Sequence, residues 1–363
     1  MADNQTTYNV LDLFCGCGGI SKGFEMAGYN IIGGIDFNKD ATLTFAKNFK
    51  NAEVICGDIT EISDDVVTEK FQSVDIIVGG PPCQGFSSAN RWQKEIDDPR
   101  NKLFFQYLRF VRILRPKALL IENVRGLLTR DNGYAKEQII KLLTELGYFV
   151  SFTIEDASEY GVPQQRKRAV IVGIRSDYNS RPFDFLSIEK LPKVTVDEAL
   201  SNLYHLDKMT ENEIWEEPKA LTVFQQEIQD GMSLLYDHEI KYPADIVQKR
   251  ISYVPQGGNW KDVPEELWPS NRQNRHSSAY KRLHQDKPSC TIDTGNAHSN
   301  YFHPLYNRIP SIRESARLQS FPDSFIFVGS RGSRYKQVGN AVPPFLARAI
   351  AKALKKHLEN ESN

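Results

Sequence analysis

The sequence predicts an α/β protein with a first half that forms a mostly parallel β-sheet covered by helices, and a smaller, less regular second domain. Three observations support this prediction. Short apolar segments alternate with segments of helical periodicity up to about residue 175, which is typical of strand–helix–strand units. Several apolar segments are followed by glycine or by an acidic side chain. Such residues would lie at the carboxyl ends of the strands, which is where open α/β sheets bind their ligands. From about 186 to 310, Pro, Trp, Asn and Gly are scattered among short apolar pieces instead.

Seven short apolar runs are predicted to be the strands of the sheet, because they are rich in Val, Ile, Leu and Phe and are bounded by turn or helix signals. The run at 118–121 is apolar throughout, as expected for a strand that is covered on both faces. In chain order, the predicted strands are 10–14, 31–35, 53–56, 74–78, 118–121, 150–154 and 169–174.

Helices are predicted where apolar side chains recur every three or four residues. The segment 103–114 has this spacing and stops before a proline, and the segment 135–146 ends at Gly147, a residue type that commonly terminates helices. Near the C-terminus, the segment 345–358 follows two prolines, and we expect this helix to pack back on the first domain. The other predicted helices of the first half are 22–27 and 41–49.

Length and composition exclude several classes of protein. The chain has 363 residues, 40% of them hydrophobic, and 45 basic against 46 acidic side chains, so it is neither a disordered chain nor a basic tail. Five cysteines are too few and too scattered for a disulfide framework, which indicates a reducing compartment. No apolar run approaches the roughly 20 residues that cross a bilayer. The N-terminus lacks a charged and apolar leader, so neither membrane insertion nor export is expected.

We expect two domains: residues 1–185, completed by 335–363, and residues 186–334. Charge is unevenly distributed in the second domain. Residues 186–245 contain 13 acidic and 5 basic side chains, whereas residues 246–336 contain 14 basic and 7 acidic ones. A basic stretch of this kind can face nucleic-acid phosphates, although a solvated surface of mixed charge explains the composition equally well.

The first predicted strand leads into the glycine-rich turn DLFCGCGG at 12–19, directly before a helix. Glycines permit close backbone approach to a nucleotide-type ligand, although a packing turn is an equally good interpretation of the turn alone. Counted from Gly16, the dinucleotide fingerprint G-x-G-x-x-G requires a glycine where this chain has Ser21, which disfavours NAD. Asp36 and Asp58 follow the next two strands, where carboxylates can accept from ribose hydroxyls and from an adenine amine. The three strand ends together predict an adenosine-type cofactor.

A cysteine and a carboxylic acid are predicted at the same edge of the sheet. The segment GGPPCQGFS at 79–87 follows the fourth strand, and its prolines and glycines hold Cys83 in a restricted turn. A small buried thiol is the ordinary alternative. Glu122 and Asn123 follow the fifth strand, where a structural acid that caps the next helix is the alternative. The arrangement predicts a nucleophile and an acid that face one crevice.

The segment PQQRKR at 163–168 precedes the last strand of the sheet. Because alternate residues of a strand face the same side, Arg166 and Arg168 are predicted to share a face. There they can orient Glu122 or bind a phosphate or a base oxygen, since a guanidinium offers a fixed fork of donors. A solvated basic face is the alternative.

These motifs together resemble the cytosine C5 DNA methyltransferases that use S-adenosyl-L-methionine. The resemblance extends through nearly the whole first half and the last fifty residues. It implies a Rossmann-like methyltransferase domain with a mostly parallel seven-stranded sheet, and a target-recognition domain between the arginine motif and RESARLQ. The matching stretches, in chain order, are DLFCGCGG, Asp36, Asp58, GGPPCQGFS, ENV at 122–124, QQRKR at 164–168, RESARLQ at 313–319 with FPD at 321–323, and GNAVPP at 339–344.

The resemblance also implies a mechanism. Cys83 adds to C6 of cytosine while Glu122 donates a proton to N3, so that C5 becomes nucleophilic enough to take the methyl group. Asn123, Arg166 and Arg168 orient Glu122 and the base, and a base such as bound water then removes the C5 proton. Neither face of the ring is reachable in a stacked duplex, so the cytosine must be flipped out.

The cofactor and substrate residues carried over by resemblance form one set. Asp36 is expected to hold the ribose, and Asp58 with Ile59 the adenine. Gln84 and Ser87 are expected to contact the substrate backbone. No metal is expected, because the histidines show no zinc spacing with cysteines. The full cofactor set is Phe14, Gly16, Gly19, Asp36, Phe37, Asp58, Ile59, Pro82, Leu103, Asn340 and Val342.

The second domain supplies the predicted DNA-binding surface through its positive charge and its aromatic side chains. The segment QGGNW at 256–260 is either a hairpin that touches bases or a plain surface turn. The aromatic candidates are Trp260, Trp268, Tyr280 and Tyr301.

The resemblance implies a bacterial modification enzyme that acts on double-stranded DNA in the cytoplasm as a monomer, paired with a nuclease that acts separately. Three alternatives remain at this point. An RNA methyltransferase of the branch that modifies transfer RNA shares the architecture. A DNA-binding protein without turnover is disfavoured by the intact set of Cys83, Glu122 and Arg168, and an NAD oxidoreductase has no use for Cys83.

Overall fold

The computed structural model describes residues 6–82, 101–129, 133–208, 219–230, 234–268, 280–294 and 300–359. The chain divides into two compact units, each of which is built from separate stretches of sequence. Unit 1 consists of 1–160, 167–190 and 342–363, and unit 2 consists of 161–166 and 191–341.

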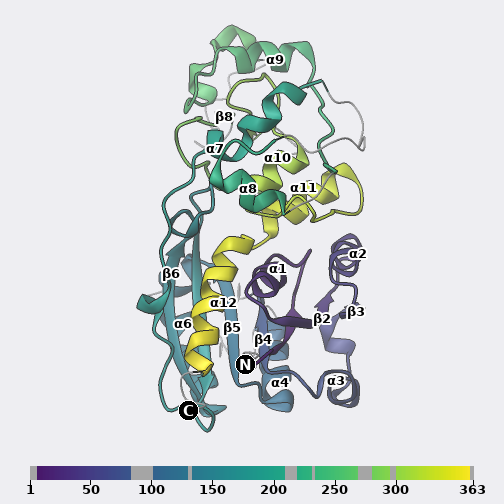
Figure 1. Ribbon diagram of the computed structural model, residues 1–363, viewed down its shortest axis with the longest axis vertical. Helices are drawn as coiled ribbons and strands as arrows, with labels where there is room; N and C mark the ends of the chain where they lie inside the picture. The colour runs from purple at the N-terminus through teal and green to yellow at the C-terminus, as the bar shows by residue number, and fades with distance from the viewer. Residues whose placement is uncertain are drawn as a thin grey trace, which may run out of the picture. The chain divides into compact units, whose positions relative to one another are not determined.

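Unit 1 contains a seven-stranded sheet with the strand order β3-β2-β1-β4-β5-β7-β6 (Figure 1). The five strands from β3 to β5 are parallel, whereas β7 runs antiparallel to both of its neighbours, β5 and β6. The prediction of a mostly parallel seven-stranded sheet is thus confirmed. The strands are β1 (Asn9–Leu13), β2 (Asn30–Asp36), β3 (Glu53–Cys56), β4 (Ile76–Gly79), β5 (Ala118–Val124), β6 (Tyr148–Asp156) and β7 (Lys167–Arg175).

The side chains of Asn38 and Ser63 cap two helices of unit 1, and apolar side chains form the buried faces of its helices. The side chain of Asn38 accepts from the backbone N–H of Ala41 at 3.0 Å, which satisfies a free donor at the start of α2. In α4, Phe104, Tyr107 and Val111 are buried at helical spacing against the sheet. The helices are α1 (Gly19–Met26), α2 (Lys39–Asn48), α3 (Asp64–Phe71), α4 (Lys102–Leu114), α5 (Gly126–Thr129), α6 (Tyr134–Glu145) and α12 (Pro344–Glu359).

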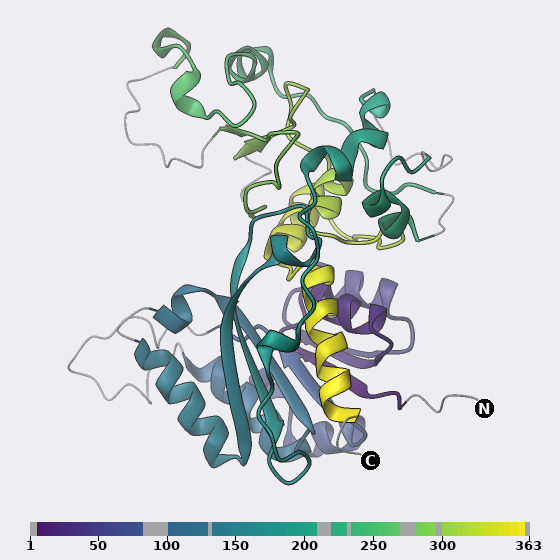
Figure 2. The same cartoon turned by 60° about the vertical axis from the view of Figure 1, so that its left-hand side comes forward.

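The C-terminal helix α12 packs on α1, as expected from the sequence (Figure 2). A Cβ on Gly23 would lie 2.5 Å from the Cβ of Ala347, so glycine allows the two helices to approach closely. The hydroxyl of Tyr29 donates to the carbonyl of Ala351 at 2.9 Å and fixes the same contact. The first and last helices of the described chain therefore complete one hydrophobic core.

Unit 2 has little regular sheet, as the scattered Pro, Trp, Asn and Gly predict. Its described strands, β8 (Lys281–Arg282) and β9 (Tyr301–Phe302), form a short parallel pair. The helix that contains the RESARLQ motif is buried along its whole length. The helices are α7 (Val196–Leu200), α8 (Val223–Gln229), α9 (Asp245–Ser252), α10 (Ile312–Leu318) and α11 (Arg331–Asn340).

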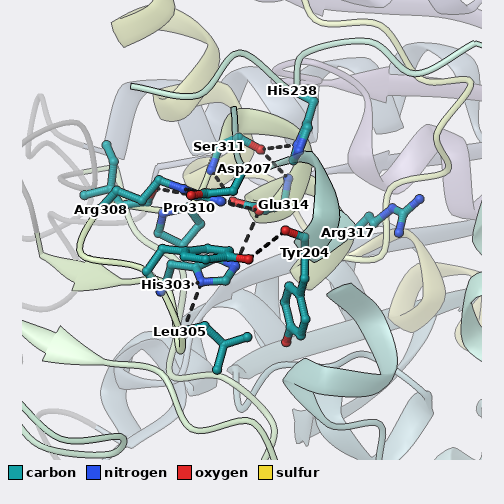
Figure 3. Close-up of polar contacts among 12 residues, drawn as sticks. Tyr204, Asp207, His238, His303, Leu305, Arg308, Pro310, Ser311, Glu314 and Arg317 are labelled. Carbon is teal, nitrogen blue, oxygen red and sulfur yellow. Dashed lines mark hydrogen bonds and ion pairs between the residues drawn. The ribbon is translucent and has the colours of Figure 1, made fainter. Parts of the chain in front are cut away.

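A buried ion-pair network surrounds the start of α10 (Figure 3). The guanidinium of Arg308 donates to both carboxylate oxygens of Glu314, at 2.7 and 2.9 Å, and to Asp207 at 2.6 Å. Nε2 of His303 lies 3.5 Å from Glu314, and Nδ1 of His238 lies 2.9 Å from the hydroxyl oxygen of another network residue, Ser311. Burial lowers the pKa of His238 to about 4 and that of His303 to about 3, so both rings are neutral at pH 7.

The network changes the interpretation of the basic excess in residues 246–336. Four arginines of this segment have buried side chains that donate to groups within unit 2, so they are not at the surface, where phosphates bind. Of the four aromatic side chains that were expected to contact DNA, two are buried. Trp260 and Trp268 are partly buried and pack against an apolar cluster of Ile251, Tyr280 and Phe302. The four arginines are Arg282, Arg308, Arg313 and Arg317, and the two buried aromatics are Tyr280 and Tyr301.

Within the described ranges, no helix is long and apolar enough to span a bilayer.

Candidate active site

The glycine loop between β1 and α1 has a backbone that only a few residue types adopt easily. Gly16 and Gly18 have φ values of 52° and 97°, and Phe14 takes a φ of 60°, which is strained for a bulky residue. A Cβ on Gly18 would lie 2.5 Å from Phe49, whereas a Cβ on Gly16 would meet no atom within 4 Å. The loop therefore packs tightly at Gly18 and leaves open space at Gly16, as a ligand cradle requires.

Asp36, at the end of β2, holds this loop from the side. Its carboxylate accepts from the backbone N–H of Gly16 at 2.9 Å and from that of Asn38 at 2.8 Å. Burial raises the pKa of Asp36, and these backbone donors act in the opposite direction. The neighbouring ring of Phe37 is 78% exposed, which leaves an apolar face beside the carboxylate. The structure thus brings together three predicted cofactor residues from two strand ends.

Asp58 lies near the end of the next strand, since β3 pairs with β2 in a register that aligns Cys56 with Asp36. Its side chain accepts from the backbone N–H of Thr60 at 2.8 Å, and this hydrogen bond is the main cause of its lowered pKa. Ile59, next in the chain, is buried in the core, and Arg109 of α4 donates to its carbonyl at 3.0 Å. The predicted adenine contacts are therefore held by a short, well-anchored turn.

Glu122 and Arg168 form an ion pair at the carboxyl end of β5. Nε of Arg168 lies 2.8 Å from Oε1 of Glu122, and the two side chains are 16% and 14% exposed. The antiparallel pairing of β5 with β7 aligns Val124 with Arg168, which brings the guanidinium beside the acid. The other oxygen, Oε2, lies 3.4 Å from the position that a Cβ on Gly80 would occupy, so it faces the start of the GGPP turn.

Asn123 connects the same strand to this turn, because its side-chain amide donates to the carbonyl of Pro81 at 2.8 Å. Pro82 is exposed and is the last described residue of the turn. Cys83, Gln84 and Ser87 lie outside the described residues, so the nucleophile and the two substrate contacts remain predictions. Glu122 and Asn123 thus frame the base of the turn that carries Cys83.

Arg166 belongs to unit 2, whereas Arg168 lies on β7 in unit 1. The side chain of Arg166 is 3% exposed and donates to the carbonyls of Ile292 and Gly339, each at 3.0 Å, within unit 2. Strand β7 begins at Lys167, so the alternation of a strand does not reach Arg166. These contacts give Arg166 a structural role within unit 2, and its role toward Glu122 remains a prediction.

The remaining predicted cofactor residues lie on several elements. Gly19 begins α1, and Leu103 lies in the first turn of α4 against the main core. Asn340 is exposed at the end of α11 in unit 2, and Val342 is half-buried in unit 1. Their contacts with a cofactor remain predictions. Among the residues that the structure describes, no cluster of three His, Cys, Asp or Glu side chains has metal-binding geometry.

Sequence reasoning missed one polar pair in the site. The Ser21 hydroxyl donates to Oδ2 of Asp12 at 2.6 Å, beneath the glycine loop, and both side chains are buried. Burial raises the pKa of Asp12 to about 7. An acidic residue within an otherwise apolar predicted strand was the available signal, because an acid in a covered strand must find a partner or a proton.

Comparison with known proteins agrees with this geometry. The family model of the C-5 cytosine-specific DNA methylases matches residues 8–356. The chain is 38% identical to the type II methyltransferase M.DdeI of Desulfomicrobium norvegicum, over 97% of this chain and 89% of that protein. It is 36% identical to the type II methyltransferase M1.HphI of Haemophilus parahaemolyticus, over 97% and 87%.

Solved structures share the fold. A prophage-encoded protein of Escherichia coli, assigned as a DNA modification methyltransferase, superposes with a TM-score of 0.79 at 26% identity, over 98% of this chain and 100% of that chain. The Dnmt2 methyltransferase of Schizosaccharomyces pombe is similar in fold alone, with a TM-score of 0.57 at 19% identity, over 97% and 99%. With the family model covering nearly the whole chain, this protein belongs to the C-5 cytosine-specific DNA methylases, which transfer a methyl group from S-adenosyl-L-methionine to C5 of cytosine in DNA.

Proposed function

We propose that the chain methylates cytosine within a specific sequence of double-stranded DNA, through a transient covalent bond between Cys83 and C6 of a flipped-out base. The observation that supports this route most strongly is the Glu122–Arg168 pair, held beside the turn that leads to Cys83. An acid fixed next to a nucleophile is what the chemistry of cytosine requires.

The chemistry follows from the weak nucleophilicity of cytosine C5. The Cys83 thiolate attacks C6 and forms a C–S bond, while Glu122 delivers a proton to N3, so that the ring electrons move to C5. S-adenosyl-L-methionine supplies the electrophilic methyl group that C5 attacks. A base, such as a bound water, then takes the C5 proton, and the Cys83–C6 bond breaks to release the thiolate. The proton on N3 returns to the Glu122 carboxylate, which leaves neutral methylated cytosine.

The described residues have distinct tasks in this scheme. Arg168 binds Oε1 of Glu122, which orients Oε2 toward the turn and toward a base that enters beside it. Asn123 fixes the Pro81 carbonyl and so the base of the Cys83 turn. Asp36 holds both the Gly16 amide and, in our proposal, the ribose hydroxyls of the methyl donor. The open space at Gly16 fits close approach of the donor to the backbone.

We propose further that residues 186–334 recognise the target sequence and that the enzyme is the modification partner of a restriction nuclease. The curated relatives named above are type II methyltransferases, which supports this context. In the proposal, the enzyme acts as a monomer in the bacterial cytoplasm, and the nuclease acts separately. DNA is favoured over transfer RNA as the substrate because the family model is that of DNA methylases and the relatives that are 36–38% identical to this chain are type II methyltransferases.

The test has two stages. Bisulfite sequencing of DNA from cells that express the protein first identifies the methylated sequence. A duplex with 5-fluorocytosine at that position is then incubated with protein and methyl donor, because fluorine at C5 cannot leave as a proton does and traps the covalent state. We expect an irreversible complex joined at Cys83, and no complex with Cys83→Ala.

Cys290→Ala is the matched control, since Cys290 is a half-buried thiol of unit 2 that has no role in the scheme. It should form the complex as the unchanged protein does. A complex that survives Cys83→Ala would refute the assigned nucleophile. Methylation of transfer RNA at a higher rate than duplex DNA would refute the assigned substrate.

A further inference from the structure

A buried carboxyl group ties the two ends of the glycine loop together and has no place in the scheme above. Asp12 lies on β1, Ser21 lies in the first turn of α1, and their hydrogen bond of 2.6 Å spans the loop. Asp12 is 1% exposed, and Ser21 is fully buried. Because the N-cap residue of α1, Gly18, has no side chain to cap the helix, the Asp12–Ser21 hydrogen bond is a side-chain link between the start of the helix and the strand.

The second oxygen of this carboxyl group, Oδ1, has no hydrogen-bond partner within the described part of the chain. On β1, Asp12 is in register with Gly34 on one side and with Val78 on the other, and neither residue has a polar side chain. A buried carboxylate oxygen without a donor is costly, unless the group carries a proton. The geometry therefore favours a neutral carboxylic acid in the ligand-free protein.

The titratable groups that face Asp12 supply no positive charge. Asp36 approaches from β2 and carries a like charge, Cys15 and Cys17 lie in the loop, and Tyr107 approaches from α4. Burial raises the pKa of each of these thiols and of the phenol well above its usual value, so they stay neutral. Burial is also the main reason why the pKa of Asp12 is raised to about 7, and the Ser21 hydrogen bond opposes that shift.

We propose that Asp12 is a positioning residue for the methyl donor, and that its carboxyl group releases its proton when the donor binds at the loop that it anchors. The donor has two cationic groups and one carboxylate, hence a net positive charge. A positive charge near a carboxyl group favours the ionised form of that group, and the effect is stronger in the low dielectric of the protein interior than in water. The O–H bond of Asp12 breaks, its electron pair stays on the carboxylate, and the proton passes to the buffer.

The coupling between ligand binding and the ionisation of Asp12 should be stronger for the methyl donor than for its product. S-adenosyl-L-homocysteine has a neutral thioether in place of the sulfonium and no net charge, so it stabilises the ionised Asp12 less. Donor affinity should therefore rise with pH until Asp12 is ionised in the free protein, and product affinity should rise less. Asp12 thus helps the protein to exchange product for fresh donor.

Titration calorimetry of the full-length protein without DNA tests this link, in two buffers of different ionisation enthalpy at pH 7. Because a group with a pKa near the working pH is about half protonated, we expect the release of up to about half a proton per donor bound, and less for the product. Asp12→Asn keeps an acceptor for Ser21 but cannot titrate, so its release should fall to near zero.

Ser21→Ala separates positioning from packing. It removes the hydrogen bond that lowers the pKa of Asp12, so the midpoint of donor affinity against pH should move upward, whereas a purely structural loss would weaken binding without moving the midpoint. This variant also carries the test if Asp12→Asn does not fold. Asp75→Asn is the control. Asp75 directly precedes β4, at the amino ends of the parallel strands and thus away from the glycine loop, and it forms an ion pair of 2.8 Å with Lys117.

Unchanged proton release in Asp12→Asn, or an unmoved midpoint in Ser21→Ala, would overturn the assignment. Proton release that disappears in Asp75→Asn would place the titrating group elsewhere. None of these measurements depends on Cys83 or on DNA, so failure here leaves the proposed covalent route untouched.

Discussion

Arg168 contacts Glu122 through an ion pair of 2.8 Å between Nε and Oε1, across the antiparallel pair of β5 and β7. Arg168→Gln keeps a polar side chain but removes the positive charge. Since a positioned proton donor contributes roughly 100-fold or more to a reaction, we expect the single-turnover methylation rate to fall by about 10- to 100-fold. DNA affinity, measured by fluorescence anisotropy, should change by less than about threefold.

Lys167→Gln is the matched control for that variant, because Lys167 is the exposed neighbour of Arg168 in β7. It removes the same charge without reaching Glu122 and should leave the rate near that of the unchanged protein. Equal losses in the two variants would mean that the general charge of this strand, and not the contact with Glu122, supports the reaction.

Asp36→Ala should weaken methyl-donor binding. The change removes an acceptor for the Gly16 amide as well as the proposed ribose contact, and hydrogen bonds to a charged group contribute about 1.5–3 kcal/mol. We therefore expect the donor Kd from calorimetry to rise by about 10- to 100-fold. Asp65→Ala, an exposed acid of α3, is the control. An unchanged Kd in Asp36→Ala would contradict the ribose assignment.

Gly23→Ala should destabilise unit 1. The added methyl group would lie 2.5 Å from the Cβ of Ala347, and overpacking of this kind typically costs about 1–3 kcal/mol. Urea unfolding followed by circular dichroism should show a lower midpoint. Gly332→Ala is the control, since a Cβ at that helical position meets no atom within 4 Å and should stabilise α11 slightly. A lower midpoint for Gly332→Ala than for Gly23→Ala would contradict this account.

Acid should destabilise unit 2 before the solution reaches the range in which most carboxylates titrate. The pKa of His238 is lowered by burial to about 4 and that of His303 to about 3, below the usual 6.5. Between these values the two histidines are protonated in the unfolded chain but neutral in the folded one, so acid favours unfolding. Stability is then complete above pH 6.5 and is lost as pH falls toward 4. The pKa of Glu314 is held well below its usual value by Arg308, which adds to the loss at lower pH.

Urea midpoints at pH 7, 5.5 and 4.5 measure this dependence. His238→Gln should reduce the dependence of the urea midpoint on pH, even if the variant is less stable at pH 7. Glutamine does not titrate, so unfolding of the variant is no longer accompanied by proton uptake at this position. His205→Gln, at an exposed position, should keep the full dependence. An equal pH slope in the two variants would rule out the buried ring as the source.

The strands of unit 1 could be predicted because their apolar runs are short and lie between clear turn signals. The direction of β7 could not, since side-chain alternation is the same in both directions of a strand. A signal was present, however: the stretch between β6 and β7 has no segment of helical periodicity, and parallel neighbours need a crossover that is usually a helix. Helix α3 was missed although Ser63 and two acids mark its first turn.

The site was predictable where residues follow strand ends, as Asp36 and Glu122 do, because sheet topology gathers such ends. The prediction that Arg166 shares a face with Arg168 assumed a strand that includes both residues, but β7 begins at Lys167, so strand alternation does not extend to Arg166. Charge counts overestimated the basic surface of unit 2, because they treat every arginine as exposed. Arg308, Arg313 and Arg317 are buried and donate to carboxylates or backbone carbonyls inside the unit.

The packing of α12 on α1 has a consequence for synthesis on the ribosome. Unit 1 begins near the N-terminus but takes its last helix from residues 344–359, after all of unit 2 has been translated. A nascent chain that lacks these residues leaves Gly23 and Tyr29 without the helix that covers them. The cell therefore obtains a finished methyl-donor domain only from complete chains, and prematurely terminated products should be unstable and readily degraded.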